Sequence, residues 1–128
     1  MNDLQFADDV LARIRARGAV YHERSFLFVL AAIEYLQSNL DARRHVNGAE
    51  LAWACRDFAR AQFGLLAPHV LAHWGVTRTQ DFGRIVFTLV EVGLLVTQPG
   101  DQEGDFEGVF DFADAFGDVY EWSGVRGV

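Results

Sequence analysis

The sequence predicts a single, mostly helical α+β domain in which about five helices are followed by a two-stranded β-hairpin. Apolar residues recur every three or four positions up to Gly93, which is typical of amphipathic helices. Beyond Gly93 the pattern changes to short, strand-like runs separated by turn residues. The 128 residues, 51% of them hydrophobic, are enough for one domain with a buried core. We therefore expect one domain over 1–128, with a helical part, 1–98, and an acidic hairpin and tail, 99–128.

Regularly spaced apolar residues predict the first two helices. The first spans 3–17 and ends at Gly18, because glycine readily adopts the left-handed conformation of a helix end. The second spans 24–39 and is unusually apolar, which predicts a central position in the fold. The apolar stripes are Leu4, Ala7, Val10, Leu11 and Ile14 in the first helix, and Phe26, Val29, Leu30, Ile33 and Leu36 in the second.

A capping signal marks the start of the third helix. Asn47 followed three residues later by Glu50 resembles a capping box, with asparagine in place of serine or threonine. This helix is expected to continue to Gly64. A shorter helix over 65–74 follows, in which Pro68 is tolerated because it falls in the first turn.

The fifth helix and the hairpin complete the expected order of elements. Thr77 with Gln80 repeats the capping pattern and begins a helix over 78–92. The runs 94–97 and 109–112 suit two strands joined by a turn-rich loop. Helix, tight turn, helix and hairpin in succession is the winged-helix order, so the second half is expected to be winged-helix-like, with the hairpin as its wing.

Charge is distributed unevenly along the chain. Residues 1–98 hold ten acids and ten arginines, whereas 99–128 hold eight acids and one arginine, which accounts for the net charge of −7. An acidic segment with interleaved aromatic residues is typical of a surface that binds a basic, apolar-lined groove on another protein. We therefore expect a non-enzymatic protein-interaction or assembly module. Its partners could include further copies of the same chain.

Composition excludes several kinds of chemistry. The chain has eleven arginines and no lysine, so a phosphate-binding P-loop, a Schiff-base enzyme and a protein kinase cannot be built. No catalytic set is evident, and no cofactor is expected. No apolar run reaches the ~20 residues that a membrane helix needs. One cysteine and an acidic N-terminal region indicate a cytoplasmic protein.

Two segments carry a resemblance to a known group of proteins. Arg44–Leu51 reads RHVNGAEL, and Asp81–Phe87 reads DFGRIVF. Together they resemble a family of small uncharacterised bacterial proteins, over a likeness that extends roughly from Phe6 to Phe116. The resemblance implies a shared fold and a bacterial origin, and it assigns no catalytic residue.

A basic cluster precedes the third helix and is the first candidate site. Two arginines and a histidine beside free helix amides could hold a phosphate or a carboxylate, or support an enzyme that acts on such an anion. Alternatively, the asparagine caps the helix and the arginines pair with acids. The residues are Arg43, Arg44, His45, Asn47 and Gly48.

Metal and thiol chemistry receive weaker support. His69 and His73 are spaced like two of the ligands of a zinc site, but a third ligand is required, and ordinary surface histidines fit equally well. The acidic loop 101–107 does not follow the order of a calcium-binding EF-hand. Cys55 falls on the apolar stripe of the third helix, where a core position is expected rather than a nucleophile.

The C-terminal third offers the candidate partner surface. Its aromatic residues could contact a protein partner, or they could complete the domain's own core with the acids pointing outward. The candidate contacts are Asp105, Phe106, Asp114, Phe116, Tyr120 and Trp122.

Nucleic-acid binding is the alternative that the winged-helix order raises. Helix 78–92 would then present Arg78, Gln80, Arg84 and Thr88 to a groove. The wing, however, would carry Asp101, Glu103, Asp105 and Glu107. These carboxylates would repel phosphates, whose neutralisation supplies most non-specific affinity, and they disfavour this alternative.

Overall fold

The structure, a computed structural model, describes residues 3–16 and 20–117 of the chain. Within them lie five α-helices and two short 3-10 helices, and residues 112–117 are also helical. The elements are α1 (Asp3–Ala16), α2 (Glu23–Ser38), α3 (Gly48–Phe63), η1 (Gly64–Leu66), α4 (Ala67–His73), α5 (Thr79–Glu91) and η2 (Glu103–Phe106). The number and the approximate bounds of the predicted helices are thus confirmed.

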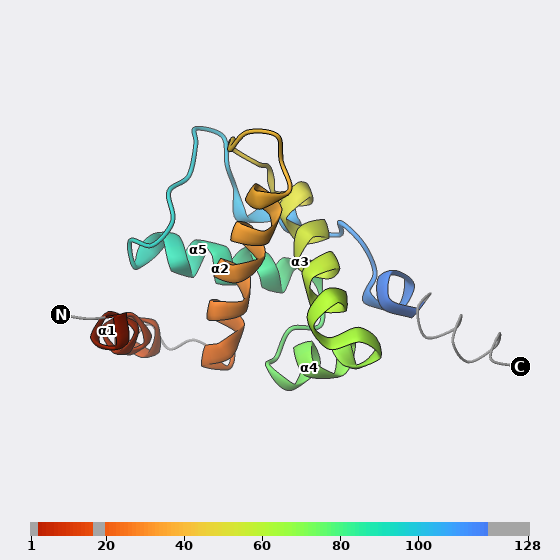
Figure 1. Cartoon of the computed structure of the whole chain (residues 1–128), viewed down its shortest axis with the longest axis horizontal. Coiled ribbons are helices and arrows are strands. Elements are labelled where there is room, and N and C mark those ends of the chain that lie inside the picture. The colour runs from red at the N-terminus through yellow and green to blue at the C-terminus, as the bar shows by residue number, and fades with distance from the viewer. Residues whose placement is uncertain (1–2, 17–19, 118–128) are drawn as a thin grey trace, which may run out of the picture.

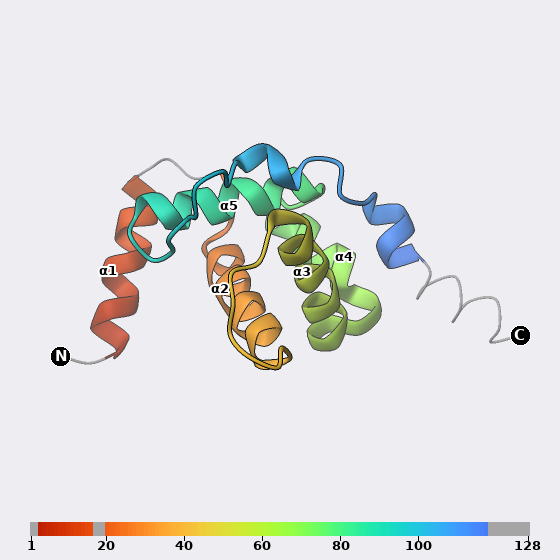
Figure 2. The ribbon, with the colours of Figure 1, turned by 90° about the horizontal axis from the view of Figure 1, so that it is seen from above.

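The helices α2 and α3 pack side by side, and α5 contacts both of them (Figure 1). The short helix α4 packs against α3, and α1 lies beside the C-terminal end of α5 (Figure 2). One bond that holds α1 there runs from the Arg13 guanidinium to the Val92 carbonyl oxygen, at 2.7 Å. The second helix, α2, packs against both α3 and α5 through Phe26, Phe28 and Val29, while its other side, with Leu27, is exposed.

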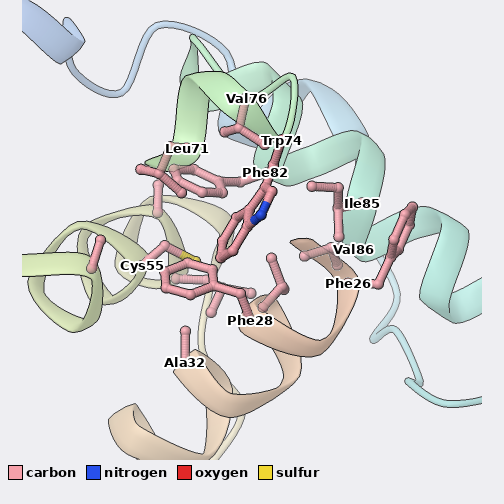
Figure 3. Packing of buried hydrophobic residues seen from close by; sticks show 14 of the residues in the cluster. Phe26, Phe28, Ala32, Cys55, Leu71, Trp74, Val76, Phe82, Ile85 and Val86 are labelled. Atoms are coloured by element: carbon pink, nitrogen blue, oxygen red, sulfur yellow. The ribbon is translucent and has the colours of Figure 1, made fainter. Parts of the chain in front are cut away.

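The core lies where α2, α3, α4 and α5 converge. Phe26 of α2, Cys55 of α3 and Phe82 of α5 are fully buried. Figure 3 shows Cys55 and Phe82 near the rings of Phe28 and Trp74, with Phe26 on the other side of the cluster, near Val86. Burial of each large apolar side chain stabilises the fold by roughly 1.5–3 kcal/mol.

The two helix starts differ in how well the sequence predicted them. The capping box of α3 is present: the Asn47 side chain accepts a hydrogen bond from the Glu50 amide at 2.8 Å, and the Glu50 carboxylate accepts one from the Asn47 amide at 3.0 Å. For α5 the prediction was wrong about the residues, because a carboxylate one position beyond Gln80 supplies the bonds.

That carboxylate belongs to Asp81, which is buried. One oxygen accepts hydrogen bonds from the amides of Thr77 and Arg78, at 2.9 and 3.0 Å, and the other accepts one from the Tyr21 hydroxyl at 2.6 Å. Asp81 therefore caps α5 and at the same time ties it to the segment that precedes α2. The pKa of Tyr21 is raised to about 12, first by burial and then by this hydrogen bond.

The predicted β-hairpin is wrong. Neither 94–97 nor 109–112 forms a strand, and no strand occurs anywhere in residues 3–16 and 20–117, so the described fold is helical, and neither the α+β class nor the winged-helix likeness holds. Instead, residues 94–117, which we name the strap, run along α5 and past the N-terminal end of α3 (Figure 2). The alternating apolar side chains of the strap pack against the helices, so they need no partner strand to cover them.

Two glycines, Gly48 and Gly83, which we name the glycine seat, allow the strap to lie directly on the helices. A Cβ atom on Gly48 of α3 would lie 2.8 Å from the Asp105 Cβ, and one on Gly83 of α5 would lie 2.9 Å from the Phe106 Cδ1. Real Cβ atoms do not approach other atoms so closely. The absence of a side chain at both positions therefore lets η2 lie directly on two helices, with the Phe106 ring buried between them.

Contacts between aromatic rings hold the C-terminal half of the strap. The Arg56 guanidinium lies 5.0 Å from the centre of the Trp53 ring and donates a hydrogen bond to the Ala115 carbonyl oxygen at 3.1 Å. Such a bond and the ring contacts fix the backbone against α3 and α5. The ring pairs, with their centroid separations, are Trp53–Phe110 at 4.5 Å, Phe110–Phe112 at 5.8 Å, Phe82–Phe112 at 5.9 Å and Phe112–Phe116 at 5.2 Å.

Candidate functional site

A cavity of about 170 Å³ lies between α2, α3, α5 and the strap. Its wall is mainly apolar and draws on all four elements. The apolar side chains include Ile33 of α2, Leu51 of α3, Val86 and Val90 of α5, and Leu95 and Phe106 of the strap. The cavity exists because η2 rests on the glycine seat while residues 94–102 loop outward before it.

The polar residues that line the cavity include a histidine and two acids. The His45 Nε2 lies 3.2 Å from the Asp101 Oδ1, and the Asp101 Oδ2 accepts a hydrogen bond from the Gln98 amide at 2.7 Å. The amide bond, followed by the histidine contact, holds the pKa of Asp101 below its usual range. Asp105 also lines this end, so the mouth is acidic in character.

The predicted anion site is built differently from the sequence expectation. Arg43 forms a two-pronged ion pair with Glu34, at 3.0 and 3.3 Å, and Arg44 forms one with Glu50, at 3.2 and 2.8 Å. Arg44 and the Asn47 amide together lower the pKa of Glu50 to about 2. The carboxylates that neutralise both guanidiniums are thus already supplied by the chain, which favours the structural interpretation of these arginines.

The structure still brings most of this cluster to the cavity. Arg44, His45, Asn47 and Gly48 all line it, whereas Arg43 does not. The Asn47 side chain is used as the cap of α3. Of this cluster, His45 therefore contributes an imidazole to the polar edge of the cavity. It lies beside Asp101 and Asp105, which the sequence analysis expected in the wing of a hairpin.

The two histidines of the candidate metal site lie on α4. Both are exposed, and the His73 ring lies 6.2 Å from that of His22. Among the residues that the structure describes, no group of three histidine, cysteine, aspartate or glutamate side chains could hold a metal ion. In the acidic loop, the carboxylates of Asp101 and Asp105 accept bonds from amides three residues earlier, so they stabilise turns.

Cys55 is completely buried in α3, as expected for a core residue. Burial raises the pKa of its thiol, which disfavours the thiolate that nucleophilic chemistry requires.

The strap carries the acidic surface. Its six acids are accompanied by no basic residue between positions 94 and 117. All but Asp101 are exposed, and the nearest cation to Glu103 is Arg84, 4.0 Å away. The six acids are Asp101, Glu103, Asp105, Glu107, Asp111 and Asp114.

The aromatic residues expected on this surface are distributed differently. Phe106 and Phe116 are 2% and 4% exposed, so their rings belong to the core, whereas Asp105 and Asp114 face solvent. Tyr120 and Trp122 lie outside the described residues.

The sequence analysis missed Trp53, which is 41% exposed and whose ring packs at a tilt against that of Phe110. Its position on α3 gave no signal, because the helical register places it on the side of the helix away from the apolar stripe of Leu51 and Cys55.

The helix proposed for nucleic-acid recognition is partly covered. The 3-10 helix η2 packs on α5, and Glu103 of η2 lies near Arg84, one of the two arginines that would face a phosphate backbone. A carboxylate at this distance competes with a phosphate for the same guanidinium.

No family model, curated protein or solved structure matches this chain. The resemblance to a family of small bacterial proteins therefore stays a prediction. None of the described helices is long and apolar enough to cross a bilayer.

Proposed function

We propose that this chain is a non-enzymatic protein-interaction module and that the outer face of the strap is its contact surface. The observation that carries the proposal is the separation of residue types along the strap. Its rings pack inward on α3 and α5, while five of its six carboxylates are exposed. A surface already held in place loses little conformational entropy on binding, so more of the contact energy is available as affinity.

The partner in this proposal has a basic surface beside an apolar groove. Exposed carboxylates steer the approach of a cationic surface and set its orientation. Trp53 and Phe110, which stack beside Arg56, supply a partly exposed aromatic patch next to the acids. Aromatic residues of this kind provide much of the binding energy in protein interfaces. A cytoplasmic location, expected from the single cysteine, is part of the proposal.

Paired charge variants test this function. Glu107→Gln with Asp114→Asn removes two strap charges, and neither acid forms an ion pair within the described residues. The control, Asp41→Asn with Asp9→Asn, removes two exposed acids that lie off the strap. Both variants have the same net charge, so a difference between them reports the position of the acids.

The measurement is capture of partner proteins from bacterial lysate, quantified by mass spectrometry at several salt concentrations. The strap variant should lose specific, salt-sensitive partners with basic surfaces that the wild type and the control variant retain. Equal capture by both variants, or retention of the same partners at high salt, contradicts the proposal.

A further inference from the structure

The cavity beneath the strap is not used by the proposed interaction surface, which lies on the strap's outer face. It is, however, the place where the two segments singled out in the sequence meet. Arg44–Leu51 contributes much of one side, and Val86 and Phe87 from Asp81–Phe87 contribute another. Segments far apart in the chain thus converge on one partly open cavity.

The volume and the apolar lining of the cavity indicate which apolar group of a ligand would fit there. An apolar cavity of about 150 Å³ lined by leucine, isoleucine and phenylalanine binds benzene. This cavity has a similar volume and a mainly apolar wall, with polar side chains at one end. Ile33, Leu51 and Phe106 from three different elements face it. A single six-membered ring therefore fits within the apolar part of the cavity.

The polar end of the cavity indicates which polar group of a ligand would bind there. The His45 Nε2 is in contact with the Asp101 carboxylate, so the neutral ring carries its proton on Nε2 and presents Nδ1 as an acceptor. Among the described residues, none forms a hydrogen bond with Nδ1. A hydroxyl group at the open end can donate to this nitrogen.

Charge at the mouth selects against anions. The guanidinium of Arg44 is neutralised by Glu50, whereas Asp101 and Asp105 contribute two carboxylates to the same end. A ligand carboxylate placed beside His45 would meet like charge at short range.

We propose that this cavity binds a neutral, hydroxyl-bearing monocyclic ring of the phenol class. The ring lies among the apolar side chains of α2, α3, α5 and the strap, and the hydroxyl donates to the His45 Nδ1. The inference is independent of the proposed protein interaction, because it concerns the inner face of the strap.

Three probe molecules test the ligand class on the full chain. Phenol has the ring and the hydroxyl, toluene has the ring alone, and benzoate has the ring with an anionic head. Titration followed by methyl NMR should shift the signals of Ile33, Val90 and Leu95, which line the cavity. Phenol should bind up to about tenfold more tightly than toluene, as expected for one hydrogen bond, and benzoate most weakly.

Two variants test the residues. In His45→Ala the affinities for phenol and toluene should become equal, whereas the control His69→Ala, an exposed histidine on α4, should keep the preference for phenol. Val86→Phe fills the cavity and should abolish binding of all three probes. If that variant does not fold, the methyl shifts in the wild type still locate the ligand. Methyl signals that do not move, tighter binding of benzoate than of phenol, or an unchanged preference in His45→Ala would each overturn the inference.

Discussion

Replacing Gly83 with alanine should destabilise the protein, although the same change stabilises an ordinary helix. Within a helix alanine is more favourable than glycine by about 1 kcal/mol. In α5, however, the new Cβ would lie 2.9 Å from the Phe106 Cδ1 and 3.0 Å from its Cβ and Cγ. The sign of the effect therefore reports whether η2 rests directly on this helix.

The magnitude follows from two opposing contributions. Insertion of one methyl group into a packed site costs typically about 1–3 kcal/mol. The crowded atoms lie at the root of the Phe106 side chain, so rotation of the ring alone cannot relieve the contact. After subtraction of the helix gain of about 1 kcal/mol, Gly83→Ala should lower the free energy of unfolding by roughly 1 kcal/mol.

Urea unfolding followed by far-UV circular dichroism measures this change. Gly104→Ala is the matched control, because a Cβ there meets no atom within 4 Å, and it should leave the stability nearly unchanged. In a Phe106→Ala background, itself destabilised by about 3–5 kcal/mol, the contacts with Cγ and Cδ1 are lost and only the contact with the Cβ at 3.0 Å remains, so Gly83→Ala should destabilise the protein less than it does in the wild type. A Gly83→Ala protein more stable than the wild type would refute the close approach.

Three further predictions concern single groups. Tyr21→Phe should lower the free energy of unfolding by about 1–2 kcal/mol, because Asp81 loses one of its three donors. Since the pKa of Tyr21 is about 12 in the folded protein and 10.0 ordinarily, its contribution is complete below pH 10 and is lost between about pH 10 and 12; alkaline unfolding curves of wild type and variant should therefore converge over this range. Asn47→Ala should cost about 1 kcal/mol through loss of the α3 cap, measurable by thermal unfolding, and an unchanged melting temperature would contradict that role. Cys55 should react with a thiol reagent only in denaturant, and rapid labelling of the folded chain would show that its thiol is accessible.

The sequence was sufficient for the helices because their signals are local. Apolar spacing and glycine ends set the bounds of α2 and α3 to within one or two residues, and the Asn47–Glu50 capping box depends on neighbours three positions apart. Cys55 was placed in the core by the same periodicity. Each of these features is fixed by contacts within one helix.

The strap could not be predicted because its contacts are made between distant segments. The alternation over 109–112 indicated a strand, but these rings find partners on α3 and α5, such as Trp53 and Phe82. Nothing near Gly48 or Gly83 in the sequence shows that η2 rests on them. The pairing of Arg44 with Glu50 depends on the path of the segment before α3, and the meeting of His45 with Asp101 required the complete chain path.

The strap separates two environments within a few residues. Leu95 and Phe106 form part of the cavity wall, while Glu103 and Glu107, on or directly after the same short helical turn, are exposed to solvent. Neither acid lines the cavity, so the charge of the outer surface can be altered by substitution without replacement of a side chain in the cavity wall.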